Sequence, residues 1–209
     1  NKNEIYHNVI NHMKEVIEKN IDLSTVDYIS GGERRDWFFS NIISYLLKKP
    51  HLTIYKDLSI VCSDSDFTST QSITNINGKN VLHIADLVTV ASSYIRAWIP
   101  AIKAINGNMK YSCVVVDRMQ GGREKIEAEG VKFYSLINVD NSLFEMAYNK
   151  GIINENQLEM LKGFFKNPDE TMKQFLISHP EFLENSLNSD EKTRKRAKLL
   201  VDGNLYGLN

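Results

Sequence analysis

Asp86 and the small or hydroxylated residues after it are the residues best suited to chemistry in this sequence. An apolar run of strand length, residues 81–85, leads into Asp86, and apolar residues recur at helical spacing from Ile95 to Ile105. This pattern predicts a strand, a turn and a helix. A carboxylate at the strand end, beside the free N–H groups of a helix N-terminus, can bind the hydroxyls and the phosphate of a sugar phosphate.

A second acidic residue follows another apolar run. Val114, Val115 and Val116 precede Asp117 and Arg118, and a glycine pair comes soon after, at residues 121–122. The three valines do not alternate with polar residues, which favours a central parallel strand buried on both faces.

A third candidate segment follows a short strand predicted over residues 26–30. It contains Gly31, Gly32, Arg34 and Arg35. Paired glycines allow a backbone to approach a phosphate closely, and arginines supply permanently charged planar donors. A tight turn with solvated arginines explains the same residues. The aromatic residues 37–39 that come next favour core or interface packing over base stacking.

Residues 85–93 resemble the phosphoribosyl-diphosphate (PRPP) motif of type I phosphoribosyltransferases. They read Ala-Asp-Leu-Val-Thr-Val-Ala-Ser-Ser, where the family has two acidic residues, two hydrophobic residues and Thr-Thr-Gly-Gly-Ser. Ala85 replaces one acid, and Ala91 and Ser92 replace the glycines. Residues 117–122 are similar to the strand-end Asp-Arg-x-x-Gly-Gly of orotate phosphoribosyltransferases. Two motifs in the family's order are a much stronger signal than either one.

The resemblance implies transfer of ribose 5-phosphate from PRPP to a pyrimidine-type base such as orotate, with release of diphosphate and with Mg²⁺ as cofactor. It implies that Asp86 binds ribose hydroxyls and that Arg118 contacts the base. The 5′-phosphate would lie against Thr89, Val90, Ala91, Ser92 and Ser93. The segment with Gly31, Gly32, Arg34 and Arg35 would receive the diphosphate, and Lys56 matches the family's lysine at the base of a closing lid.

The sequence departs from the family in the parts that do the chemistry. Residues 58–78 are polar and predict a long lid or disordered segment, yet residues 57–77 contain no Lys, Arg or His to offset the charge of diphosphate. The lack of cations in this segment favours the alternative of a non-catalytic nucleotide-binding or regulatory interaction protein, in which Asp86 and Arg118 would form a strand-end ion pair or cap. The family's N-terminal lysine and aromatic pair around the pyrimidine have no counterpart before Asn3, so we expect either that this sequence omits that segment or that this branch lacks it.

Alternating strands and helices predict an α/β fold with a doubly wound, mostly parallel sheet of five strands flanked by helices. The strands are expected near residues 26–30, 52–55, 81–85, 112–116 and 131–136. We expect residues 1–139 to form a phosphoribosyltransferase-like domain and residues 140–209 to form a helical extension packed on it.

Composition limits the other classes of function. The net charge of −1 comes from interspersed acidic and basic residues, which argues against nucleic-acid binding. No apolar segment reaches membrane-spanning length, and no signal peptide is predicted. Two isolated cysteines suit a reducing compartment, so we expect a cytoplasmic protein. The resemblance also implies a homodimer.

Overall fold

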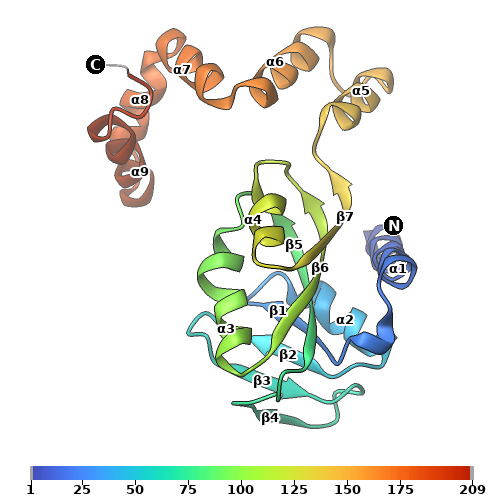
Figure 1. Ribbon diagram of the computed structural model, residues 1–209. Coiled ribbons are helices and arrows are strands. Elements are labelled where there is room, and N and C mark those ends of the chain that lie inside the picture. The colour runs from blue at the N-terminus through green and yellow to red at the C-terminus, as the bar shows by residue number, and fades with distance from the viewer. Residues whose placement is uncertain (1, 208–209) are drawn as a thin grey trace. The chain divides into compact units, whose positions relative to one another are not determined.

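The computed structural model describes residues 2–207, and the chain divides into two units, Asn1–Val139 and Asp140–Asn209. The first unit is built around one seven-stranded sheet with the order β4-β3-β2-β1-β5-β6-β7 (Figure 1). The five expected strands are confirmed and run parallel: β1 (Tyr28–Gly32), β2 (His51–Ile54), β5 (Asn80–Val88), β6 (Asn108–Asp117) and β7 (Lys132–Asn138).

The two additional strands form a hairpin where we expected a long lid. β3 (Ile60–Ser63) pairs antiparallel with β2, and β4 (Thr70–Ser72) pairs antiparallel with β3. Asp64 closes the turn, because its carboxylate accepts hydrogen bonds from the backbone and hydroxyl of Thr68 and from the Ser69 hydroxyl. The prediction of an unstructured segment is therefore wrong: the Ser-, Thr- and Asp-rich composition makes turn hydrogen bonds and the edge of the sheet.

Helices cover both faces of the sheet, as expected for a doubly wound fold (Figure 1). α1 (Lys2–Asn20) and α2 (Trp37–Leu47) contribute to one apolar cluster. A π-helical turn, η2 (Tyr94–Trp98), with α3 (Ile99–Ala104) and α4 (Gly122–Ala128), contributes to the other. A short 3-10 helix, η1 (Leu23–Thr25), precedes β1.

The central strand β5 joins the two clusters. Successive side chains of a strand point to opposite faces, so Val81 and Ala85 lie in the cluster of α3 and α4, whereas Leu82 and Ile84 lie in the cluster of α1 and α2. All four are buried. Burial on both faces explains why residues 81–85 are continuously apolar apart from His83.

The second unit contains the predicted helices, which are α5 (Asn141–Asn149), α6 (Glu155–Lys166), α7 (Pro168–Ser178), α8 (Pro180–Leu187) and α9 (Glu191–Asp202). Their starts follow local capping chemistry. The Asn167 side chain caps α7 by accepting the N–H of Glu170, and Pro168 is the first residue of that helix. The Asp190 side chain caps α9 by accepting the N–H groups of Lys192 and Thr193. Among the described residues, no helix has the length and apolar character needed to span a membrane.

Candidate functional site

A cavity of about 360 Å³ opens at the carboxyl ends of β1 and β5. Its walls are residues 33–36 of the turn between β1 and α2, residues 85–93 of β5 and the loop after it, and Tyr94 and Trp98 of η2. This is the edge at which ligands bind in open parallel sheets. The volume suits a small phosphorylated molecule rather than a macromolecule.

The loop after β5 turns sharply and leads straight into a helical turn. Ala91 has a left-handed backbone with φ of +57°, and its carbonyl accepts the N–H of Ile95. The first N–H groups of a helix have no acceptor within it and are available to an anion. The conformation at residue 91 is one that glycine adopts without steric cost, and alanine adopts it here with its methyl group buried.

The glycine pair of the second motif supports this loop from behind. A Cβ atom on Gly122 would lie 2.4 Å from Val88 Cγ1 and 2.6 Å from the carbonyl oxygen of Thr89. Only glycine allows α4 to begin so close to the loop. The two motifs are also joined by the pairing of β5 with β6. Val88 of the first motif pairs with Asp117 of the second, which comes 29 residues later in the chain.

Asp86 and two arginines line the cavity from two different segments, β5 and the turn between β1 and α2. Asp86 Oδ2 lies 3.4 Å from Arg35 Nε, and the Asp86 side chain is 27% exposed while that of Arg35 is 82% exposed. Arg34 also lines the cavity and is exposed. Asp86 therefore forms an ion pair with Arg35 at the strand end, and the exposure of Arg35 leaves this pair easy to open.

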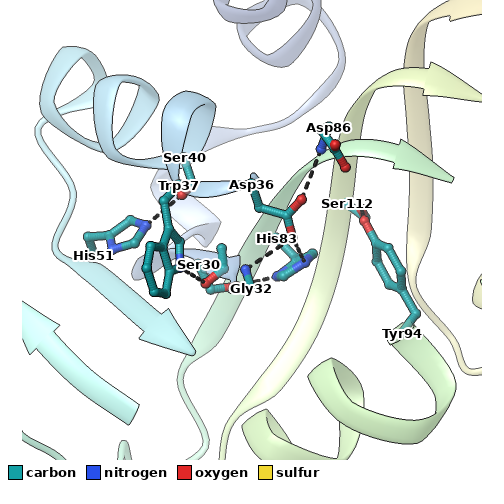
Figure 2. Close-up of polar contacts among 11 residues, drawn as sticks. Ser30, Gly32, Asp36, Trp37, Ser40, His51, His83, Asp86, Tyr94 and Ser112 are labelled. Atoms are coloured by element: carbon teal, nitrogen blue, oxygen red, sulfur yellow. Dashed lines mark hydrogen bonds and ion pairs between the residues drawn. The ribbon is translucent and has the colours of Figure 1, made fainter. Parts of the chain in front are cut away.

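A buried polar cluster lies beneath the cavity (Figure 2). The Asp36 carboxylate accepts the N–H of Gly32 at 3.1 Å and the N–H of Asp86 at 3.0 Å. His83 Nδ1 lies 2.9 Å from Ser30 Oγ, and the Tyr94 hydroxyl lies 2.8 Å from Ser112 Oγ.

Burial changes the protonation of these groups. It raises the pKa of Asp36 to about 7, with the charge of Asp86 acting in the same direction. It lowers the pKa of His83 and the pKa of His51 to about 3, so both rings are neutral at physiological pH. Burial also moves the pKa of Tyr94 well above its ordinary range.

Comparison with known proteins gives a consistent set of relatives. No family model matches the chain. Orotate phosphoribosyltransferase of Sulfurisphaera tokodaii is 26% identical over 163 residues, which cover 77% of this chain and 77% of that protein. Orotate phosphoribosyltransferase of Sulfolobus acidocaldarius is 24% identical over 90 residues, or 43% of this chain and 45% of the relative. Orotate phosphoribosyltransferase of Pyrococcus abyssi is 43% identical over 70 residues, or 34% of this chain and 37% of the relative.

Solved structures agree on the fold. UMP synthase of Leishmania donovani has a TM-score of 0.59 at 17% identity, over 78% of this chain and 32% of that chain. Orotate phosphoribosyltransferase of Francisella tularensis has a TM-score of 0.57 at 16% identity, over 77% of this chain and 78% of that chain. The chain is therefore similar in sequence to orotate phosphoribosyltransferases and shares the fold of these solved structures.

Most of the candidate binding residues from two separate segments lie together in the structure. Asp86 and residues 89–93, from the segment that resembles the PRPP motif, line the same cavity as Arg34 and Arg35 of the turn after β1. Lys56 and Arg118 are exposed and lie outside its lining. The backbone N–H of Lys56 donates to Glu33 Oε2 at 3.0 Å, and that of Arg118 donates to the Val88 carbonyl, so both residues are tied to segments that form the cavity.

Gly31 and Gly32 lie in β1, are buried and do not line the cavity. A Cβ atom on Gly31 would lie 2.2 Å from Ser40 Oγ, and one on Gly32 would lie 2.3 Å from Trp98 Cε2. Close packing of α2 and η2 against β1 therefore explains this glycine pair without a phosphate. Their contact with diphosphate remains a prediction.

The residues that the sequence did not single out are Asp36, Tyr94, Trp98 and Glu33, all of which line the cavity. Asp36 carried one local signal, since an acid at the start of a helix ordinarily caps it. Its side chain makes no cap hydrogen bond. It accepts the N–H groups of Gly32 and Asp86 instead, and Asp86 is 50 residues away.

Proposed function

We propose that this chain is a PRPP-dependent phosphoribosyltransferase that transfers ribose 5-phosphate to a pyrimidine-type base such as orotate and releases diphosphate. The observation that carries the proposal is one cavity lined by Asp86, by the turn of residues 89–93, and by Arg34 and Arg35. The cavity thus combines an acceptor for hydroxyls, a helix start for one phosphate and two cations for a second anionic group.

The reaction needs positioning more than proton transfer. A ring nitrogen of the base attacks the anomeric carbon, and the bond from that carbon to diphosphate breaks while positive charge develops on the sugar. Asp86 would exchange its ion pair with Arg35 for the ribose hydroxyls. The released Arg35, with Arg34, would then offset the charge that develops on the leaving diphosphate.

The two exposed residues outside the lining, Arg118 and Lys56, complete the assignment. Arg118 follows β6, and its guanidinium is suited to a carboxylate such as that of orotate. Lys56 follows β2 next to Glu33 and would add a third cation on the diphosphate side. Both assignments follow the resemblance to orotate phosphoribosyltransferases.

Mg²⁺ fits this proposal as a companion of the ligand. Within residues 2–207, no three His, Cys, Asp or Glu side chains are grouped so that they could hold a metal ion. The chain therefore offers no cage of its own, and we propose that Mg²⁺ arrives bound to the diphosphate oxygens of PRPP, where it supplies charge neutralisation.

Calorimetric titration with PRPP and Mg²⁺ tests the proposal. We expect binding by the wild-type chain and at least roughly tenfold weaker binding by Asp86→Asn, because hydrogen bonds to a charged carboxylate are lost. Asp57→Asn is the matched control, since Asp57 is an exposed acid in the turn before β3 that hydrogen-bonds Ser59 and lies outside the cavity lining. No heat from the wild type at millimolar PRPP would refute the proposal.

A non-catalytic nucleotide-binding or regulatory protein is the second candidate. The ordered β3–β4 hairpin favours it, because residues 57–77 lack cations and Asp64 is committed to holding the turn. This candidate predicts that PRPP or a nucleoside monophosphate binds without turnover. Conversion of orotate to its nucleotide, measured by the change in ultraviolet absorbance, would eliminate it.

The outer face of α2 supports a proposed homodimer. α2 buries Ser40, Ile43, Ser44 and Leu47, whereas its exposed residues are the apolar Phe38, Ile42, Tyr45 and Leu46. Phe38 is 64% exposed. A helix that is apolar on both faces has a second surface to bury. We expect a dimer mass by light scattering and a monomer mass for Ile42→Glu; a monomeric wild type at micromolar concentration would contradict the proposal.

A further inference from the structure

The strands β1 and β5 separate beneath the cavity, and one side chain bridges the gap. Their pairing ends at Ser30 and His83; beyond it β1 continues beside β2, and β5 continues beside β6. The Asp36 carboxylate lies at this point, where Oδ2 accepts the Gly32 N–H and Oδ1 accepts the Asp86 N–H (Figure 2). Asp36 thus provides acceptors for one backbone N–H group of each strand, at a point where the two strands no longer pair with each other.

This bridge is a different task from capping the helix. Asp36 is the N-cap residue of α2, yet its side chain makes no hydrogen bond to the helix. One of its two donors belongs to β1 and the other belongs to Asp86, the proposed ribose-binding residue. The Asp36 carboxyl group therefore holds the backbone of Asp86 directly.

His83 gives that carboxyl group a second possible partner. The His83 ring is fully buried, and Nδ1 lies 2.9 Å from Ser30 Oγ. The other nitrogen, Nε2, is buried without a hydrogen-bond partner and lies 3.8 Å from Asp36 Oδ2. A buried polar atom without a partner is costly. At 3.8 Å the two atoms are too far apart for a hydrogen bond, but a proton on Asp36 Oδ2 would supply the missing donor if the carboxyl group moved closer to His83.

Burial and the negative charge of Asp86 disfavour the charged form of Asp36, and they outweigh the two backbone N–H groups, which favour it. His83, Tyr94 and His51 are buried and neutral near physiological pH, so none of them supplies a compensating positive charge. No Lys or Arg among residues 2–207 forms an ion pair with Asp36. Arg35, the nearest cation along the chain, pairs with Asp86 instead.

We propose that Asp36 is a positioning residue that ties the turn before α2 to β5, and that its carboxyl group takes up a proton when a phosphorylated ligand enters the cavity. The protonated carboxyl group then moves from 3.8 Å to hydrogen-bond distance of His83 Nε2. This inference rests on the proposed function, because it requires an anionic ligand in the same cavity. The proton comes from solvent. It remains on Asp36 Oδ2 as a donor to His83 Nε2, while the His83 ring keeps its own proton on Nδ1 and donates it to Ser30 Oγ.

Charge supplies the reason for the coupling. Asp36 lines the cavity, so the negative charge of a bound ligand favours the neutral carboxyl group over the carboxylate. By linkage, a ligand that raises the proton affinity of Asp36 binds more tightly when Asp36 is already protonated. Burial has already raised the pKa of Asp36 to about 7, which places the transition in the range where binding can be measured.

Calorimetry in buffers with different heats of ionisation measures the number of protons taken up. PRPP with Mg²⁺ would be titrated at about pH 8 into the wild type, Asp36→Asn and Asp27→Asn. Asp27 is the matched control, because its Oδ2 accepts the Asn80 N–H at 2.8 Å and joins the same two strands at their other end. Protons carried by PRPP itself are common to all three proteins and cancel.

For a pKa that rises from about 7 to about 8, we expect the wild type and Asp27→Asn to take up about 0.4 proton more than Asp36→Asn at pH 8. Equal uptake by the wild type and Asp36→Asn would overturn the inference. If Asp36→Asn does not fold, NMR of wild-type protein with ¹³C-labelled aspartate carboxyls decides. A carboxyl group that titrates near neutral pH should move upward by about one pH unit with saturating PRPP; an unmoved titration would overturn the inference.

The same NMR titration separates this inference from the proposed function. PRPP binding without extra proton uptake removes the inference and leaves the function. Absence of PRPP binding would overturn the proposed function and the coupling of proton uptake to a ligand. In that case, a carboxyl group that titrates near neutral pH would still support a proton held between Asp36 and His83. Titration of all aspartates in their ordinary acidic range overturns the inference in either case.

Discussion

Replacing Gly122 by alanine should displace the loop that forms the proposed phosphate site. The added Cβ atom would lie 2.4 Å from Val88 Cγ1, 2.6 Å from the Thr89 carbonyl oxygen and 3.2 Å from the Ala91 nitrogen, where ordinary contacts are 3.4–4 Å. Two of these three neighbours are backbone atoms of the loop. The Thr89 carbonyl must therefore move by nearly 1 Å, or α4 must move away.

The expected size of the effect follows from this overlap. Overpacking of a well-packed region destabilises a protein by about 1–3 kcal/mol. A misplacement of about 1 Å in a binding site can reduce the rate or affinity by up to roughly a hundredfold. We predict that Gly122→Ala weakens PRPP binding roughly tenfold to a hundredfold and lowers the free energy of unfolding by about 1–3 kcal/mol.

Gly121→Ala separates the loop effect from general destabilisation. A Cβ atom on Gly121 meets no atom within 4 Å, but its φ of +80° is strained for alanine and costs about 1–2 kcal/mol. Both variants should lose similar stability in chemical denaturation, while calorimetry with PRPP should show weaker binding for Gly122→Ala alone. Equal PRPP affinity of the two variants would refute the reasoning that Gly122 supports the loop.

Three further predictions concern packing and protonation. Gly32→Ala should lower the free energy of unfolding by about 1–3 kcal/mol in chemical denaturation, because its Cβ would overlap Trp98. The loss of stability caused by Gly32→Ala should be smaller in a Trp98→Leu background. If Gly32→Ala is as stable as the wild type, Gly32 is not needed for packing against Trp98. For Asp36, the folded-state pKa of about 7 lies above the ordinary 3.8, so the stability from its neutral form is complete below about pH 4 and is lost as the pH rises through 7. This pKa difference of about three corresponds to about 4 kcal/mol. The free energy of unfolding of the wild type, measured relative to that of Asp36→Asn, should therefore fall between pH 4 and pH 7; a difference that does not change with pH would argue against a raised pKa. Gly163→Ala should raise stability by about 0.5–1 kcal/mol in thermal unfolding, since its position inside α6 has open space; no gain would mean that the helix interior is constrained in another way.

Strands with a strong local pattern were predicted correctly from the sequence. The five parallel strands follow from apolar runs such as residues 81–85, because a strand buried on both faces must be apolar along its length. The gathering of Asp86 and residues 89–93 in one cavity follows from their order in a strand, turn and helix. The β3–β4 hairpin was missed because all three residues of β4 are exposed and polar, so no apolar pattern marks the strand.

Features that depend on distant partners could not be predicted. A glycine pair such as Gly31 and Gly32 is also typical of a tight turn. Only the fold shows that Ser40 and Trp98 occupy the space that a Cβ atom on Gly31 or on Gly32 would need. Asp36 likewise gains its task from the point at which β1 and β5 separate. That point depends on strand register, which no local run of residues specifies.

A crystal structure of the chain with PRPP and Mg²⁺ is the most direct measurement of the central claim. We predict density for the 5′-phosphate over residues 89–93, ribose hydroxyls within hydrogen-bond distance of Asp86, and an opened Asp86–Arg35 pair. Density for PRPP elsewhere on the protein, or an intact ion pair with no ligand in the cavity at millimolar PRPP, would contradict the claim.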